Sequence, residues 1–154
     1  MDQLAANELP AGRGVGAWRS LLRAHATLMR QLATQLEQET GLALADYDVL
    51  AQLAIAGGEL RMTELANRAL ISRSGMTRRV ARLVDEGLVR RADATADGRG
   101  VLVALTSAGV ARLTETVPVH VRGIAEYFVS RLDDQELAVL ESALDKVTVD
   151  CTFG

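Results

Sequence analysis

The sequence contains few of the residues from which metal sites, disulfides and catalytic centres are built. Its single cysteine, Cys151, has no partner for an internal disulfide and no histidine at a metal-site spacing, which fits a reducing compartment. The two histidines, His25 and His120, lie far apart in the chain. No GxSxG, HExxH or phosphate-binding glycine loop occurs. We therefore expect neither an enzyme nor a protein that binds a metal or another cofactor.

Long hydrophobic runs are also missing. A membrane-spanning helix needs about 18 uninterrupted apolar residues, and no such stretch occurs. The N-terminal sequence MDQLAANELPAGRG lacks the basic start and apolar stretch of a signal peptide. We therefore expect a cytoplasmic protein that does not bind a membrane. Aromatic residues make up only 3% of the 154 residues and apolar residues 49%, which predicts one domain with a core of Leu, Val and Ala.

Residues 72–87, SRSGMTRRVARLVDEG, predict a short amphipathic helix. Met76, Val80 and Leu83 recur at helical spacing and form one apolar stripe. Ser72 can accept a hydrogen bond from a free amide of the first turn, and Gly87 suits the left-handed conformation just past the end. The opposite face is small and polar at its start and rich in arginine further on, so it can approach base edges and phosphates. This profile is typical of a DNA recognition helix.

A β-hairpin is predicted directly after this helix. Two β-rich segments, Leu88 to Ala92 and Val101 to Leu105, flank a loop with an Asp-Gly turn signal. Arg99 at the tip of the hairpin can enter the minor groove, where narrow A·T-rich stretches concentrate negative potential. We expect Asp97 to brace the loop or orient an arginine without touching DNA. A hairpin in this position is a wing.

Charge is concentrated in the same segment. Between Arg61 and Arg99 there are nine arginines and five acidic residues, a net charge of +4, whereas the rest of the chain carries eight basic and fifteen acidic residues. Phosphate binding would use this local excess, because binding responds to the local field and not to the total charge of −3.

These parts follow one another as in a known family. A scaffold helix (Thr63 to Leu70), a helix that begins SRSGMTR and a hairpin with Asp97-x-Arg99 leading into LTSAG resemble the core of the multiple antibiotic resistance regulator (MarR) family. The resemblance covers roughly residues 15 to 149. Members of this family are homodimeric winged helix-turn-helix transcription factors, usually repressors, that bind palindromic sites and are often released by small ligands.

The resemblance implies a mainly α (α+β) fold. A winged helix-turn-helix lobe with a two-stranded wing would span residues 44–105, and helices at residues 15–40 and 106–149 would form a dimerisation lobe, all within one domain over residues 1–154. It also implies a ligand-responsive repressor that binds double-stranded operator DNA as a homodimer. The alternative from a different class is a winged-helix protein-interaction adaptor that binds neither DNA nor ligand.

The expected DNA-binding residues belong to the recognition helix and the wing. Arg90 and Arg91 are left out, because strand residues near the base of the wing can equally be solvated or paired with Asp93. The set is Ser72, Arg73, Ser74, Thr77, Arg78, Arg79, Arg82, Asp97 and Arg99.

Apolar residues near both ends of the chain predict helices with more apolar surface than one chain can cover. A stripe from Val15 to Leu36 steps by three and four residues, and two more run over residues 110–128 and 137–147. Two chains that share these helices would hold their recognition helices about one DNA turn apart, roughly 34 Å, over a palindrome.

Local signals mark the ends of the C-terminal helices. Asp133 predicts the start of the last helix, with Glu136 as its capping-box partner. Pro118 should kink or break the preceding helix near Val117.

Candidate effector-binding residues are Trp18, Arg19, His25 and Tyr47. Trp18 and His25 lie seven residues apart on one face of the first helix, where packing at a dimer interface is the other interpretation. A Trp with a basic neighbour suits a small aromatic or anionic effector through stacking and charge. The peroxide-sensing branch of the family has a reactive cysteine near its N-terminus, whereas this chain has none before Cys151. That form of redox sensing is therefore not expected.

Overall fold

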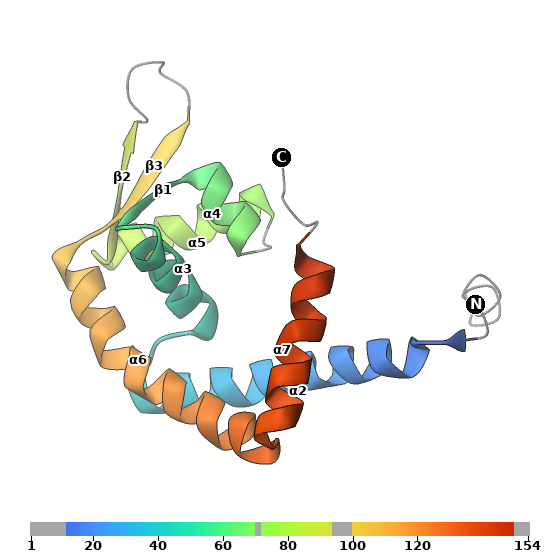
Figure 1. Cartoon of the computed structure of the whole chain (residues 1–154). Coiled ribbons are helices and arrows are strands. Elements are labelled where there is room, and N and C mark those ends of the chain that lie inside the picture. Colours follow the sequence, from blue (N-terminus) through green and yellow to red (C-terminus); the bar gives the residue numbers. More distant parts are fainter. Residues whose placement is uncertain (1–11, 70–71, 94–99, 150–154) are drawn as a thin grey trace.

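The structure of the chain, a computed structural model, describes residues 12–69, 72–93 and 100–149. The three helices between residues 44 and 85 and a small sheet form one lobe, the sheet-containing lobe (Figure 1). The long helices at residues 15–40, 107–127 and 134–148 lie beside it. In chain order the elements are α2 (Val15–Thr40), α3 (Leu44–Ile55), β1 (Glu59–Arg61), α4 (Met62–Arg68), α5 (Arg73–Asp85), β2 (Val89–Asp93), β3 (Val101–Leu105), α6 (Ser107–Tyr127), the 3-10 helix η2 (Val129–Arg131) and α7 (Asp134–Thr148).

The sheet has three antiparallel strands in the order β1-β3-β2. β2 and β3 form the predicted hairpin, with Arg91 opposite Val103. β1 pairs with the other edge of β3, where Leu60 lies opposite Val103. The predicted wing of two strands therefore gains a third strand, which is only three residues long and too short to produce a visible alternation in the sequence.

The core of the sheet-containing lobe is aliphatic, as the composition predicts. α3, α4, α5 and β3 all contribute side chains with no exposed surface, and the predicted stripe of α5 lies entirely inside it. Burial of side chains this size contributes about 1.5–3 kcal/mol each. The fully buried residues are Val49, Leu50, Leu53, Leu65, Met76, Val80, Leu83 and Val103.

The start of α6 packs against the turn that precedes β2. The Thr106 hydroxyl donates to the Gly87 carbonyl oxygen (2.6 Å) and accepts from the Gly109 amide (3.0 Å), so it caps α6 and ties it to the end of α5. Gly109 is buried, and a Cβ built at this position would overlap the main-chain carbonyl of Leu88. α6 then continues through Pro118 to Tyr127. Of the kink or break predicted near Val117, the break is therefore wrong.

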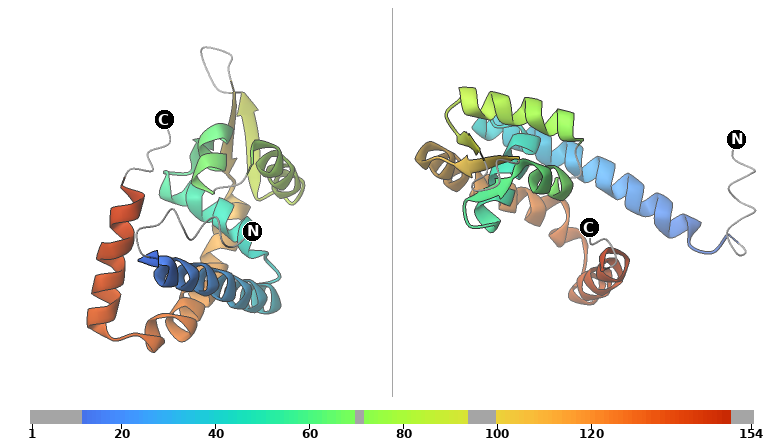
Figure 2. Two further views of the ribbon diagram at one scale, coloured as in Figure 1. Left: turned by 90° about the vertical axis from the view of Figure 1, so that its right-hand side faces the viewer. Right: turned by 90° about the horizontal axis from the view of Figure 1, so that it is seen from above.

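α2 and α6 cross, and α7 turns back from the C-terminal end of α6 (Figure 2). Gly123 of α6 lies against Leu32 and Gln35 of α2, and Arg122 pairs with Glu39. α7 begins at the predicted capping box, in which Asp133 and Glu136 exchange hydrogen bonds of 2.8 and 2.9 Å.

No residue of α7 is buried, and of α2 only Leu32 and Leu36 are. The long helices therefore leave much of their predicted apolar stripes uncovered. Within the described residues, no helix combines the length and the apolar character that crossing a membrane requires.

We predict that Gly109→Ala lowers the free energy of unfolding by about 1–3 kcal/mol, because the added methyl group forces the start of α6 away from the Leu88 carbonyl. Gly16→Ala is the matched control, since nothing lies within 4 Å of the corresponding Cβ position in α2. Chemical denaturation of both variants measures the difference. Equal stabilities would contradict the close contact at Gly109.

Candidate nucleic-acid interface

Both ends of α5 follow the predicted signals. The Ser72 hydroxyl accepts a hydrogen bond from the Gly75 amide (3.2 Å), which satisfies one of the free donors of the first turn. Glu86 ends the helix, and Gly87 follows with φ of 76°, a left-handed conformation that glycine adopts without strain. Both ends of α5 are therefore set by local interactions.

The polar face of α5 is exposed. Thr77 donates its hydroxyl hydrogen to the Arg73 carbonyl (2.8 Å), which fixes its side chain along the helix. Arginines separated by four residues lie on one side of a helix and can approach the same groove. The predicted residues that the structure places on this exposed surface are Ser72, Arg73, Ser74, Thr77, Arg78 and Arg82.

Arg79 is placed differently from the other predicted residues. Its Nη1 donates to Asp46 Oδ1 at 2.7 Å, and its side chain is 24% exposed. Because this guanidinium is directed toward α3, we do not carry Arg79 into the proposed DNA contacts. The Arg82 guanidinium lies 3.9 Å from the same carboxylate oxygen but keeps 62% of its side chain exposed.

Asp46 was missed in the sequence. It is buried in the first turn of α3, where an acidic residue indicates only a favourable interaction with the helix dipole. Its partner lies 33 residues further along the chain, and nothing in the local pattern of either residue predicts the pairing. The pair links α3 to α5 and restrains the rotation of α5 about its axis.

The wing is described up to Asp93 and from Gly100. Arg90 and Arg91 of β2 are both exposed. Asp97 and Arg99, the two wing residues of the predicted site, lie outside the described residues, as does Cys151.

The candidate effector residues are not gathered in one place within the chain. Trp18, Arg19 and His25 are exposed on the N-terminal half of α2, which extends away from the sheet-containing lobe (Figure 1). Tyr47 instead is buried in α3 and packs on His120 of α6, with 4.5 Å between the ring centroids. His120 is a residue that the sequence did not single out for this role.

The Tyr47 and His120 rings connect the sheet-containing lobe to α6. Burial lowers the pKa of the His120 imidazole, while the Asp48 carboxylate raises it to a smaller extent. Burial also raises the pKa of the Tyr47 hydroxyl, and Asp48 adds to that effect. His120 Nδ1 is buried and has no hydrogen-bond partner among the described residues.

A mostly apolar cavity of about 220 Å³ lies beside His120, between α2 and α6. Leu28, Met29 and Leu32 line it from α2, and Gly123, Ile124 and Phe128 from α6. No cluster of three or more potential metal ligands occurs among the residues that the structure describes.

Comparison with known proteins gives consistent results. A family model described as the MarR family matches residues 40–100. The solved structure of Sco3205, a MarR family transcriptional regulator from Streptomyces coelicolor in complex with DNA, is 35% identical with a TM-score of 0.80 and covers 91% of this chain and 88% of that one. AbsC, a MarR family transcriptional regulator from the same organism, is 31% identical with a TM-score of 0.79 and coverages of 86% and 89%.

A curated relative agrees with the solved structures. An HTH-type transcriptional regulator of Bacillus cereus (strain ATCC 14579) is 27% identical over 130 residues, which are 84% of this chain and 85% of that protein.

We predict that His120 makes the fold less stable in acid. Because folding lowers the pKa of His120, the unfolded chain takes up more protons as the pH falls below the ordinary value of 6.5, and the free energy of unfolding decreases there. Urea denaturation at pH 7.5 and 5.5 should show a smaller loss for His120→Gln than for the wild type. His25→Gln, at an exposed position of α2, is the control and should lose as much stability as the wild type. Equal losses in all three proteins would disprove the role of His120.

Proposed function

The chain belongs to the MarR family of transcriptional regulators, and from this membership we propose that it binds a palindromic operator as a homodimer and acts as a ligand-responsive repressor. The observation that carries the proposal is the exposed face of α5, where small polar residues at the start of the helix are followed by Arg78 and Arg82. Small side chains let the helix approach the floor of the major groove, and arginines then reach guanine edges or phosphates.

The proposal of a homodimer rests on apolar surface that one chain leaves uncovered. Trp18 is 60% exposed, and large apolar side chains on α6 and α7 are exposed as well. Exposed apolar side chains in this number on neighbouring helices favour an interface. A two-fold axis through these helices would present both copies of α5 to the same side of the duplex, as a palindrome requires. The exposed apolar residues are Trp18, Leu21, Leu22 and Met29 in α2, Val110, Val117 and Val121 in α6, and Val139 and Val147 in α7.

Ligand-dependent release is supported by the junction between the lobes. The cavity beside His120 is lined by α2 and α6, and the His120 ring packs on Tyr47 of α3. A small aromatic or anionic effector bound there would contact α2 and α6 directly and reach α3 through the His120 ring, whose Nδ1 has no hydrogen-bond partner among the described residues. An effector that binds one arrangement of the lobes better than another shifts the population toward it. The operator would be released if the favoured arrangement holds the two α5 helices at a separation that does not match the two half-sites of the operator.

We predict that Arg78→Ala weakens binding to the operator by about 1–3 kcal/mol and relaxes the base preference at one position in each half-site, as expected for an arginine that pairs with guanine. Gel shifts with a palindrome from the DNA beside the gene, and with each base of one half-site varied, measure both effects. Arg131→Ala is the control, because Arg131 lies on η2 at the opposite end of α6 from the wing.

Two results of this experiment would count against the proposal. Unchanged affinity of Arg78→Ala for every sequence would remove Arg78 from the interface. Wild-type binding that does not weaken as salt is raised would instead favour the protein-interaction adaptor, since phosphate contacts make DNA affinity fall steeply with salt.

We predict that Leu22→Asp converts the dimer to a monomer. A carboxylate buried in an apolar interface without a partner costs several kcal/mol, and the substitution occurs in both copies. Sedimentation velocity measures the change, and affinity for the palindrome should fall with it. Ile55→Asp is the control, since Ile55 is 75% exposed at the end of α3 and does not belong to α2, α6 or α7. A dimer that tolerates Leu22→Asp as well as Ile55→Asp would exclude this part of α2 from the interface.

A further inference from the structure

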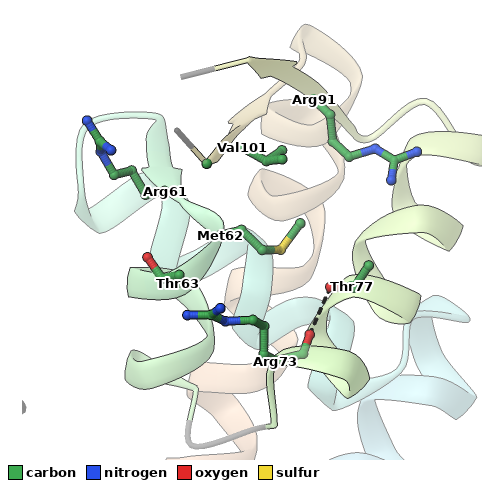
Figure 3. Close-up of a pocket in the computed structure, with 8 residues that line it drawn as sticks. Arg61, Met62, Thr63, Arg73, Thr77, Arg91 and Val101 are labelled. Carbon is green, nitrogen blue, oxygen red and sulfur yellow. Dashed lines mark hydrogen bonds between the residues drawn. The ribbon is translucent and has the colours of Figure 1, made fainter. Parts of the chain in front are cut away.

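A cavity of about 510 Å³ lies between the recognition helix and the base of the wing. It is bounded by the start of α4, the first two turns of α5 and the hairpin strands β2 and β3 (Figure 3). Arg91 extends from the wing toward α5, and the Arg73 guanidinium extends toward Thr63 of α4. The lining residues are Arg61, Met62, Thr63, Arg73, Thr77, Arg91, Gly100 and Val101.

The charge around this cavity is of one sign. Arg61, Arg73 and Arg91 come from three separate elements, and none of the lining residues is acidic. Within the described residues, neither Arg73 nor Arg91 has a salt-bridge partner, whereas Arg79 and Arg82 both lie near Asp46. Arginines remain charged at any physiological pH, so Arg73 on α5 and Arg91 on β2 make the field at this cavity positive and favour an anion there.

The position of the cavity indicates which anion would bind there. A helix in the major groove and a hairpin in the adjacent minor groove are necessarily separated by one sugar-phosphate strand, because that strand is the wall between the two grooves. The cavity lies between the two elements that would occupy those grooves. On the basis of the proposed function, we propose that this cavity holds the DNA backbone strand that separates the two grooves. Arg73 and Arg91 bind the phosphates of that strand.

The remaining lining residues fit a backbone strand as well. Met62 and Val101 present apolar atoms to the cavity, and such a surface can contact the carbon face of deoxyribose. The guanidinium groups can bind phosphate oxygens through two parallel hydrogen bonds. These contacts carry no base information, so they set how strongly and in which register α5 is presented without changing what it recognises.

The test compares Arg91→Gln with Arg90→Gln in salt titrations of operator binding. Arg90 is the neighbouring residue of β2, is also exposed, and points to the opposite face of the strand, so both variants lose the same charge at nearly the same place. Each lost phosphate contact should make the slope of log K against log salt concentration shallower by about 0.9, hence by about 1.8 for a dimer. Arg90→Gln should retain the wild-type slope.

Two further measurements separate a backbone contact from other roles. The base preference of Arg91→Gln should match the wild type, unlike that of Arg78→Ala. The melting temperature of free Arg91→Gln should be unchanged or higher, since one positive charge beside the cavity is gone and Arg91 has no salt-bridge partner among the described residues. Arg73→Gln is the second variant, and it should reproduce the shallower slope from the other side of the cavity.

Several outcomes would overturn the inference. Equal slopes for Arg91→Gln and Arg90→Gln would show that only the general field matters, and an altered base preference for Arg91→Gln would make it a base contact. Inorganic phosphate, added at fixed ionic strength, could raise the melting temperature of the wild type but not of Arg91→Gln. If the salt slopes of operator binding for Arg91→Gln and Arg90→Gln were equal as well, the cavity would be a site for a free anion. A wild-type chain that binds no DNA would refute the proposed function itself, and this inference with it.

Discussion

Burial of one face of α5 is the constraint on which the rest of the proposed DNA-binding surface depends. Met76, Val80 and Leu83 have no exposed surface, so rotating the helix about its axis would bring apolar side chains into water. The Asp46 carboxylate adds a directional restraint, because its hydrogen bond to Arg79 is satisfied at one rotation only. With that rotation set, the polar face of α5 is turned to solvent. The base-reading and phosphate-binding roles proposed for its arginines both require this orientation.

α6 connects the sheet-containing lobe, which has a buried aliphatic core, to α2 and α7, which are largely exposed. Its first turn is locked to the end of α5 by Thr106 and by the close approach at Gly109, and its later turns pack on α2 through Gly123. A rearrangement of α2, α6 and α7 would therefore be transmitted to the position of α5 through contacts that leave little room for adjustment. The buried Tyr47 and His120 pair lies on this connection. This is the physical basis for proposing that an effector at the junction alters the separation of two recognition helices.

Features with a short-range cause could be predicted from the sequence, and those with a long-range cause could not. The Ser72 cap, the glycine after α5, the hairpin strands and the Asp133 capping box each depend on neighbouring residues, and the structure confirms them. β1 was missed because it pairs with β3 more than forty positions away, as its register of Leu60 with Val103 shows. Pro118 was expected to kink or break the helix, and it does not break α6, because packing of α6 on α2 and α3 outweighs one lost hydrogen bond.

By itself, the sequence determined the type and ends of most elements, the apolar stripe of α5 and the concentration of arginine between residues 61 and 99. These depend on spacing along the chain, which a helix or hairpin converts directly into faces and turns. Only the tertiary structure decided where each arginine is placed. It pairs Arg79 with Asp46 and gathers Arg61, Arg73 and Arg91 around one cavity, because a guanidinium's partners are set by the elements packed beside it and not by its neighbours in the chain.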